Sequence, residues 1–405
     1  MNTLGDRIRS LRKQKKMTLD ALAGNVLTKG MVSLIENNKA QPSMESLSYI
    51  ANQLDIDVAE LLEEVSAEEW SKLLQKAEEL NNLEIHQHVN KYKQLYTLIH
   101  PYLEKLSHGY EAARLLELYS HCLYFEGMDD WNAYAERAEQ MYEALNISSR
   151  QVDIAIFRSE TYFVEHQYQQ SLELLLKERA HIESMYAFLD PISQVDLDYH
   201  EAFLYFAVGE AEKATDVLNQ AMRHSKKHGI FYRINDLYRL AAAYALMLGN
   251  QDQKNFYLRK LASYGDFAED DDSHVFCAII DIHWLNGEAD YSRALQLVDK
   301  VLIENKMADY HMGHLHLEKG KSLWGLAQYE EALSWLKKVD IHPDLHHPFD
   351  LSILYLKDSY QALCLEKLGD LNSAKKLAKC AVENMKSFPA TPYKDFALET
   401  YETLK

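Results

Sequence analysis

Helix-breaking residues recur about every forty residues along most of this chain, and no other sequence feature constrains the fold as strongly. Between these breaks, apolar residues recur at spacings of three and four, as on amphipathic helices, and strand patterns are almost absent. A fixed period of this length predicts stacked helical hairpins. The breaks, with spacings of 38 to 43 residues, are Gly127, His166, Gly209, Gly249, Gly287, Ala327 and Gly369.

Small residues at fixed offsets from the breaks predict how each hairpin packs. Ala214 and Ala221 follow Gly209 by five and twelve residues, and the last unit repeats these offsets after Gly369. Small side chains let two helices approach closely, and Gly permits the sharp turn between them. The pattern resembles the tetratricopeptide repeat, against the alternative of a generic helical bundle. Ala294 follows Gly287 by seven residues, which predicts a two-residue insertion in that unit.

Charge divides the chain into two parts. Residues 1–41 hold eight Lys or Arg and three acids, a balance of +5, so the net charge of -19 leaves -24 for the rest. The total alone would argue against nucleic acid as a partner, but a basic head followed by an acidic body does not. The Glu-rich stretch after residue 57 predicts a connecting helix between the two parts.

The head reads as short helices separated by clear capping and stop signals. Leu4, Ile8 and Leu11 predict one buried helix face, and further helices are expected from about Thr18, from Thr28 to Asn37, after Pro42 and Ser43, and from a capping box of Asp57 and Glu60. The segment 22–47, "LAGNVLTKGMVSLIENNKAQPSMESL", resembles the Xre/lambda-repressor type of helix-turn-helix. Its core would be Leu22, Ala23, Val32 and Ile35. Asn38 stands where Gly is usual in that family.

This resemblance implies that the third helix lies in the major groove of DNA with its N-terminal residues at the base edges. Basic side chains nearby are expected to contact phosphates, which position the domain without reading sequence. For each residue, an ordinary solvated surface position is the alternative. The candidate base-reading residues are Thr28, Lys29, Gly30, Ser33, Leu34 and Asn37, and the candidate phosphate contacts are Arg7, Arg12 and Lys39.

An Xre-type head followed by a repeat body of this length resembles the RRNPP family of peptide-sensing regulators of Gram-positive bacteria, within it the PlcR and NprR type. The resemblance implies a cytoplasmic homodimer that binds a double-stranded DNA operator. It also implies that the concave face of the repeats binds a short signalling peptide, as in quorum sensing, which changes the dimer geometry and so DNA binding. One small head makes few phosphate contacts, so two copies on a two-fold site are expected.

The repeat register predicts which residues face the concave groove. Positions thirteen, ten, six and three before each turn lie on the inner face of the first helix of a hairpin. Acids with aromatic neighbours there would suit a peptide with a cationic residue or a free N-terminus, against the alternative of ordinary polar exposure. The candidates are Asp153, Glu160, Asp196, Tyr199, Asp236, Arg239, His274, Asp281, Trp284, His314, Lys321 and Trp324, with Asn235 added because the family holds peptide backbone through Asn side chains.

Other patterns predict neither catalysis nor a bound cofactor or metal. The histidines around 311–316 and 342–347 form no H-E-x-x-H, and no phosphate loop or nucleophile elbow occurs. The four cysteines are far apart, as in a reducing cytoplasm, and no apolar run is long enough to cross a membrane.

The sequence therefore predicts an all-α chain, with a five-helix helix-turn-helix domain over residues 1–64 and a connecting helix over 65–84. A right-handed superhelix of tetratricopeptide-like hairpins follows over 85–405. The function predicted is a peptide-regulated transcription factor. The alternatives are a DNA-binding regulator whose repeats bind a protein, such as a phosphorelay protein, and a repeat adaptor whose head no longer binds DNA.

Overall fold

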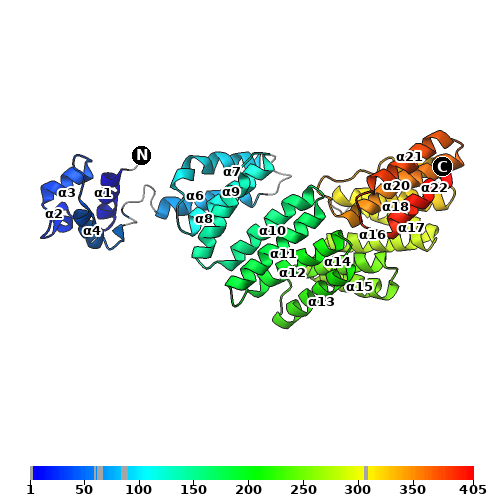
Figure 1. The fold of residues 1–405 in the computed structure, drawn as a ribbon, viewed down its shortest axis with the longest axis horizontal. Coiled ribbons are helices and arrows are strands. Elements are labelled where there is room, and N and C mark those ends of the chain that lie inside the picture. Colours follow the sequence, from blue (N-terminus) through cyan, green and yellow to red (C-terminus); the bar gives the residue numbers. More distant parts are fainter. Residues whose placement is uncertain (1–2, 59–60, 62–66, 84–89, 305–308) are drawn as a thin grey trace. The chain divides into compact units, whose positions relative to one another are not determined.

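The computed structural model of the chain describes residues 3–58, 61, 67–83, 90–304 and 309–405. Every regular element in these ranges is a helix, in agreement with the predicted all-α class (Figure 1). The chain divides into two compact units, Met1–Ile154 and Ala155–Lys405, and each is described by itself. None of the described helices is both long and apolar enough to cross a membrane.

The helices of the head each begin at a hydroxyl N-cap that accepts a hydrogen bond from a backbone amide of the first turn. Thr3 and Asp6 form a full capping box. The fifth helix predicted for the head depends on Glu60, which lies outside the described residues. The four helices are α1 (Leu4–Gln14), α2 (Leu19–Ala23), α3 (Lys29–Glu36) and α4 (Met44–Gln53).

The predicted core of the head is confirmed. Leu22, Ala23, Val32 and Ile35 are all buried together with Ile8. α1 crosses α3 so closely that a Cβ on Gly5 would collide with the carbonyl oxygen of Ile35. Asn38 has a φ of 58°, which explains why the family prefers Gly there. Its side chain also accepts a hydrogen bond from the Gly5 amide at 3.2 Å and donates one to Thr3 Oγ1 at 2.6 Å.

The rest of the first unit is built from helices packed around a second core. The segment predicted to connect head and body contains α6, whose Leu73 and Ala77 are buried against α7 and α8. Tyr142 is fully buried and donates a hydrogen bond to Glu117 at 2.6 Å. These elements are α6 (Ala67–Asn81), α7 (Lys91–Ile99), η2 (His100–Lys105), α8 (Tyr110–Phe125), α9 (Trp131–Ala144) and the start of α10 (Ser148–Val164).

The second unit consists of successive helical hairpins, in which the two helices of each hairpin pack closely. They pair as α12–α13, α14–α15, α16–α17, α18–α19 and α20–α21, and α22 packs on the last pair (Figure 1). Before them, α10 and α11 are joined by a hydrogen bond from the Ser159 hydroxyl to the carbonyl oxygen of Ser171 at 2.9 Å. The bounds are α11 (Tyr168–Met185), α12 (Pro191–Ala207), α13 (Ala211–His228), α14 (Ile234–Met247), α15 (Gln251–Ala268), α16 (Asp271–Gly287), α17 (Tyr291–Glu304), η3 (Asp309–His311), α18 (Met312–Gly325), α19 (Tyr329–Leu336), α20 (Pro348–Lys367), α21 (Leu371–Asn384) and α22 (Pro392–Leu404).

One of the predicted turns is wrong by two residues. Most predicted breaks have a positive φ, for example 84° at Gly209 and 61° at Ala327, but Gly287 is the last residue of α16. The left-handed residue of that hairpin is Ala289, with a φ of 59°. Ala294 then lies five residues after the turn, fully buried like Ala214 in its own hairpin. The unit therefore contains no insertion.

The first and last hairpins of the second unit meet. α12 contacts α20, and the segment just before α20 contacts the earlier helices. The hydroxyl of Tyr168 donates a hydrogen bond to the carbonyl oxygen of His346 at 2.8 Å, and His347 Nε2 lies 3.2 Å from the carbonyl oxygen of Phe203. Because these residues are more than a hundred positions apart, the contacts bring the first helices of several hairpins around a common space.

Candidate functional site

The exposed face of α3 is the candidate DNA-binding surface. Thr28 caps the helix by accepting a hydrogen bond from the Met31 amide at 3.2 Å. Val32 and Ile35 point into the core, whereas Leu34 is 45% exposed. Of the predicted base-reading residues, Thr28, Lys29, Gly30, Leu34 and Asn37 are exposed and Ser33 is partly exposed.

Several polar side chains on this face have partners within the head. Lys29 Nζ lies 3.0 Å from Asp20 Oδ2, in a pair whose two side chains are both mostly exposed. Asn37 donates to the carbonyl oxygen of Ser33 at 2.7 Å and accepts from Arg9. An exposed ion pair contributes little free energy, so Lys29 can exchange Asp20 for a phosphate or a base at small cost.

Of the predicted phosphate contacts, Arg7 is buried and Arg12 is held by residues of the head. Arg12 makes two hydrogen bonds to Glu36, at 2.6 and 2.9 Å, and a third to the carbonyl oxygen of Met17 at 2.8 Å. Glu36 is only 2% exposed and Arg7 only 7%, whereas Arg12 is partly exposed. Lys39 remains exposed. Met31, which the sequence analysis missed, is 42% exposed beside Leu34 on the same helix.

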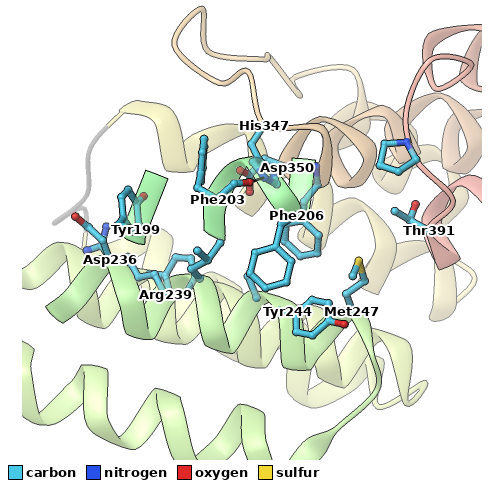
Figure 2. Close-up of a pocket in the computed structure, with 15 residues that line it drawn as sticks. Tyr199, Phe203, Phe206, Asp236, Arg239, Tyr244, Met247, His347, Asp350 and Thr391 are labelled. Atoms are coloured by element: carbon cyan, nitrogen blue, oxygen red, sulfur yellow. Dashed lines mark hydrogen bonds between the residues drawn. The ribbon is translucent and has the colours of Figure 1, made fainter. Parts of the chain in front are cut away.

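The second candidate site is a pair of adjoining cavities in the second unit. Their volumes are about 230 and 170 Å³. Both are lined by Arg239, Phe276, Phe349 and Asp350, so the two form one groove. Figure 2 shows the larger cavity, with Asp236 and Arg239 coming from α14 and Asp350 from α20.

The repeat offsets explain much of the lining that α12, α14 and α16 contribute. Tyr199, Phe203 and Phe206 lie ten, six and three residues before Gly209, and all three line the larger cavity. Asp236 and Arg239 lie thirteen and ten before Gly249. Counted from the true turn at Ala289, the same offsets select three residues of α16 that line the groove, Phe276, Ile279 and His283, which lie thirteen, ten and six positions earlier.

Four of the predicted groove residues line the cavities: Tyr199, Asp236, Arg239 and His314. His274, Asp281 and Trp284 do not, because their positions were counted from Gly287 rather than Ala289. Asp281 instead accepts from Lys254 at 2.6 Å, and His274 lies 3.3 Å from Asp266. The remaining predicted residues, which line neither cavity, are Asp153, Glu160, Asp196, Asn235, Lys321 and Trp324.

Most of these remaining residues have identifiable partners. Asp153 lies 3.1 Å from Arg150, and Glu160 lies 3.4 Å from His200. Lys321 is buried and lies 2.8 Å from Glu318. Asp196 binds Arg233 and accepts from the Tyr232 hydroxyl, Trp324 packs edge-on against Tyr291 and Tyr360, and Asn235 is partly buried on α14.

Arg239 lines both cavities, and residues at the start of α16 hold its guanidinium group. Its Nη2 lies 2.8 Å from Asp272 and 3.3 Å from the Ser273 hydroxyl, and its guanidinium lies over the Phe276 ring. Burial disfavours the charge on Asp272, but hydrogen bonds from His311 and Tyr310 outweigh it and hold the pKa of that carboxyl below its usual value. Arg239 Nε has no hydrogen-bond partner in the described part of the chain.

Asp350 differs from the other acids of the groove. It lies in the first turn of α20, after the N-cap His347, and faces both cavities. Among the described residues, no hydrogen bond or ion pair reaches its carboxylate, and burial raises its pKa from 3.8 to about 6. Sequence reasoning missed it because it lies nineteen residues before Gly369, outside the thirteen-residue window that suits shorter helices.

The histidines near the groove have structural partners. His311 Nε2 lies 2.7 Å from Asp272, and His347 caps α20 by accepting from the Phe349 amide at 3.2 Å. Burial lowers the pKa of His314 and of His347 to about 4, so both are neutral near pH 7. No cluster of three or more His, Cys, Asp or Glu side chains suited to a metal occurs in the ranges that the structure describes.

Comparison with known proteins places the head in a family. Residues 8–61 match the sequence profile described as helix-turn-helix. The head is therefore a helix-turn-helix domain, a type of domain that binds DNA. No curated protein matches the chain.

Several solved structures match the chain at low identity. Bacillus thuringiensis PlcR in complex with the peptide PapR7 and DNA is 18% identical, with a TM-score of 0.36, over 69% of this chain and 99% of that one. ComR from S. thermophilus, in complex with DNA and its signalling peptide ComS, is 18% identical, with a TM-score of 0.32, over 69% and 97%. The Streptococcus dysgalactiae SHP pheromone receptor Rgg2 is 15% identical, with a TM-score of 0.31, over 66% and 95%. Likenesses this distant establish no function for this chain.

Proposed function

We propose that this chain is a transcriptional regulator that binds a DNA operator through its head and a short signalling peptide through its second unit. The observation that carries the proposal is the groove, whose walls come from the same repeat offsets of successive hairpins. It combines aromatic walls with a few polar groups, which is typical of ligand-binding sites. The head supplies the DNA-binding half.

The working form on DNA is a homodimer. One helix-turn-helix domain contacts a single half-site, so useful specificity requires two heads at a fixed spacing. The peptide acts by changing that spacing. For this to happen, it must bind one arrangement of the dimer more tightly than another, because a ligand shifts an equilibrium only by its difference in affinity.

A band-shift assay tests both halves together. The probe is the DNA upstream of the chain's own gene, with and without synthetic peptides encoded by the adjacent small reading frame. We expect a complex whose affinity or mobility changes when the peptide is added. No complex under any condition would contradict DNA binding, and a complex that no peptide alters would contradict peptide control.

Calorimetry with the same peptides tests where they bind. We expect Asp236→Ala and Arg239→Ala to weaken binding, since both side chains line the larger cavity. Asp216→Ala is the matched control, because Asp216 is an exposed acid on α13, away from the groove lining. Unchanged affinity in both groove variants would overturn this placement.

A second candidate function, binding of a protein partner by the repeats, is favoured by one observation. Phe231, Phe267 and Ile303 are 71%, 82% and 82% exposed. All three lie where the second helix of a hairpin leads into the next hairpin. Light scattering distinguishes a partner surface from a dimer contact, because Phe231→Ser with Phe267→Ser would produce monomers only if this surface forms the homodimer.

A further inference from the structure

The acids around the groove differ in whether the fold already neutralises them. Asp272 is held by Arg239 and His311, and Asp236 lies 3.4 Å from Arg233. Glu318, beside the groove residue His283, lies within 2.8 Å of both Lys321 and His283. These carboxylates need no ligand to balance their charge.

Asp350 is the exception. It faces both cavities and has no hydrogen bond or ion pair with any residue in the described ranges. A carboxylate removed from water without a partner is costly, and the cost is recovered when an opposite charge arrives. Arg239, which lines both cavities with Asp350, is already held by Asp272 at 2.8 Å and forms no ion pair with Asp350 in the described ranges.

The walls around Asp350 suit an organic cation. Phe276 and Phe349 line both cavities, and Phe203 and Tyr199 line the larger one. Aromatic faces attract ammonium and guanidinium groups, and the attraction grows as water is excluded. A metal ion is a poor fit, because Ca²⁺ or Mg²⁺ needs several oxygen ligands and the described residues place one free carboxylate here.

We propose that Asp350 anchors a cationic group of the ligand, either a Lys or Arg side chain or a free α-amino group, in the aromatic groove between α12, α14, α16 and α20. This inference rests on the proposed peptide-binding function and specifies its chemistry. Asp350 pairs with the cation, and the rings of Phe203, Phe276 and Phe349 cover the cation's sides.

The experiment is an affinity selection on the full-length protein with a random synthetic heptapeptide pool, read by mass spectrometry. The pool is used in two forms, with free and with acetylated N-termini, to distinguish the α-amino group from a side chain. The same selection is run on Asp350→Asn and on the control Asp216→Asn. Thermal melting of each variant verifies that it is folded.

We expect the wild type and Asp216→Asn to enrich peptides with Lys or Arg at one fixed position, or peptides that require a free N-terminus. Asp350→Asn should lose this preference and bind the enriched peptides about 10- to 100-fold more weakly, as for loss of a charged hydrogen bond. Enrichment without any cation preference, or with a preference that Asp350→Asn keeps, would overturn the inference and leave peptide binding intact. No enriched peptide in either pool would overturn the proposed function itself, and the inference with it.

Discussion

The head and the groove use their charged side chains in the same way, although one faces DNA and the other a small ligand. In the head, Arg12 is enclosed by Glu36 and Met17, whereas Lys39 remains in solvent. In the groove, Asp272 is enclosed by Arg239 and His311, whereas Asp350 has no partner in the described chain. In both regions, residue type and position identify many charged groups, and the fold then encloses some of them in close pairs and leaves others more open to a partner.

The largest effect expected from this comparison is on the stability of the head. Arg12→Ala would remove two hydrogen bonds from Glu36, which is only 2% exposed, and leave it only Arg9 at 3.5 Å, at a cost of about 3 kcal/mol in the free energy of unfolding of that domain. Hydrogen exchange of α1 and α3 in the full-length protein measures it, with Lys39→Ala as the control. If Arg12→Ala left the hydrogen exchange of α1 and α3 unchanged but weakened DNA binding, Arg12 would instead be a phosphate contact.

The next largest effect is on the stability of the second unit: replacing Asp350 should stabilise the protein, whereas replacing Arg12 should destabilise it. Its pKa is raised to about 6, so between pH 4 and 6 the native protein keeps a proton that the unfolded chain releases. Stability therefore falls as pH rises through this window. Asp350→Asn should stabilise the ligand-free protein at pH 7.5 by about 1–3 kcal/mol and make no difference below pH 4.

Denaturant unfolding of wild type and Asp350→Asn at several pH values measures this difference. Comparing the two proteins at each pH removes the contribution of the other buried acids, such as Asp236 and Glu201, whose pKa values burial also raises. A variant less stable than the wild type at pH 7.5 would show that the carboxylate is structurally needed, as Glu36 is in the head.

Smaller changes in stability test whether the turn after α16 is at Ala289, the position from which the groove residues of that helix are counted. Gly287→Ala should stabilise the protein by about 0.5–1 kcal/mol, because Gly287 is helical and its added Cβ meets nothing within 4 Å. Ala289→Gly should also stabilise it by about 0.5–1 kcal/mol, because Ala289 has a φ of 59°. Thermal or urea unfolding measures both. Destabilisation by Gly287→Ala would show that Gly287 is the left-handed residue of the turn. The groove residues of α16 would then be His274 and Asp281, as counted from Gly287.

The smallest effect concerns the one predicted phosphate contact that remains exposed. Lys39→Ala should lower affinity for any duplex by less than about tenfold and reduce the slope of log affinity against log salt by about 0.9. Filter binding of the full-length protein to a duplex selected from a random pool measures it. A loss confined to one sequence would show that Lys39 reads a base.

Most of the fold could be predicted from the sequence because its signals are local. Capping residues such as Thr28 and Ser43 mark helix starts, and the apolar spacing marks which faces are buried. The one turn placed wrongly shows the limit of that reasoning. Gly287 is the residue that usually marks such a turn, but the left-handed conformation falls on Ala289, where the spacing to the buried Ala294 is preserved. Packing between the helices decided the turn against local preference.

The groove residues were predicted in part for the same reason. Offsets from a turn identify the inner face of a helix, and they select Tyr199 and Arg239. They do not extend to Asp350, because α20 has 20 residues and its first turn lies beyond the usual window.

The sequence by itself determined the helices, nearly all of their turns and the helix-turn-helix domain, because these depend on patterns within a few tens of residues. Only the tertiary structure decided which charges remain free. Arg12 meets Glu36 across 24 residues, and Arg233 meets Asp196 across 37. Asp350 reaches the groove only because α12 and α20, four hairpins apart, come into contact. Such contacts depend on small rotations between repeats that accumulate along the array, and no local pattern records their sum.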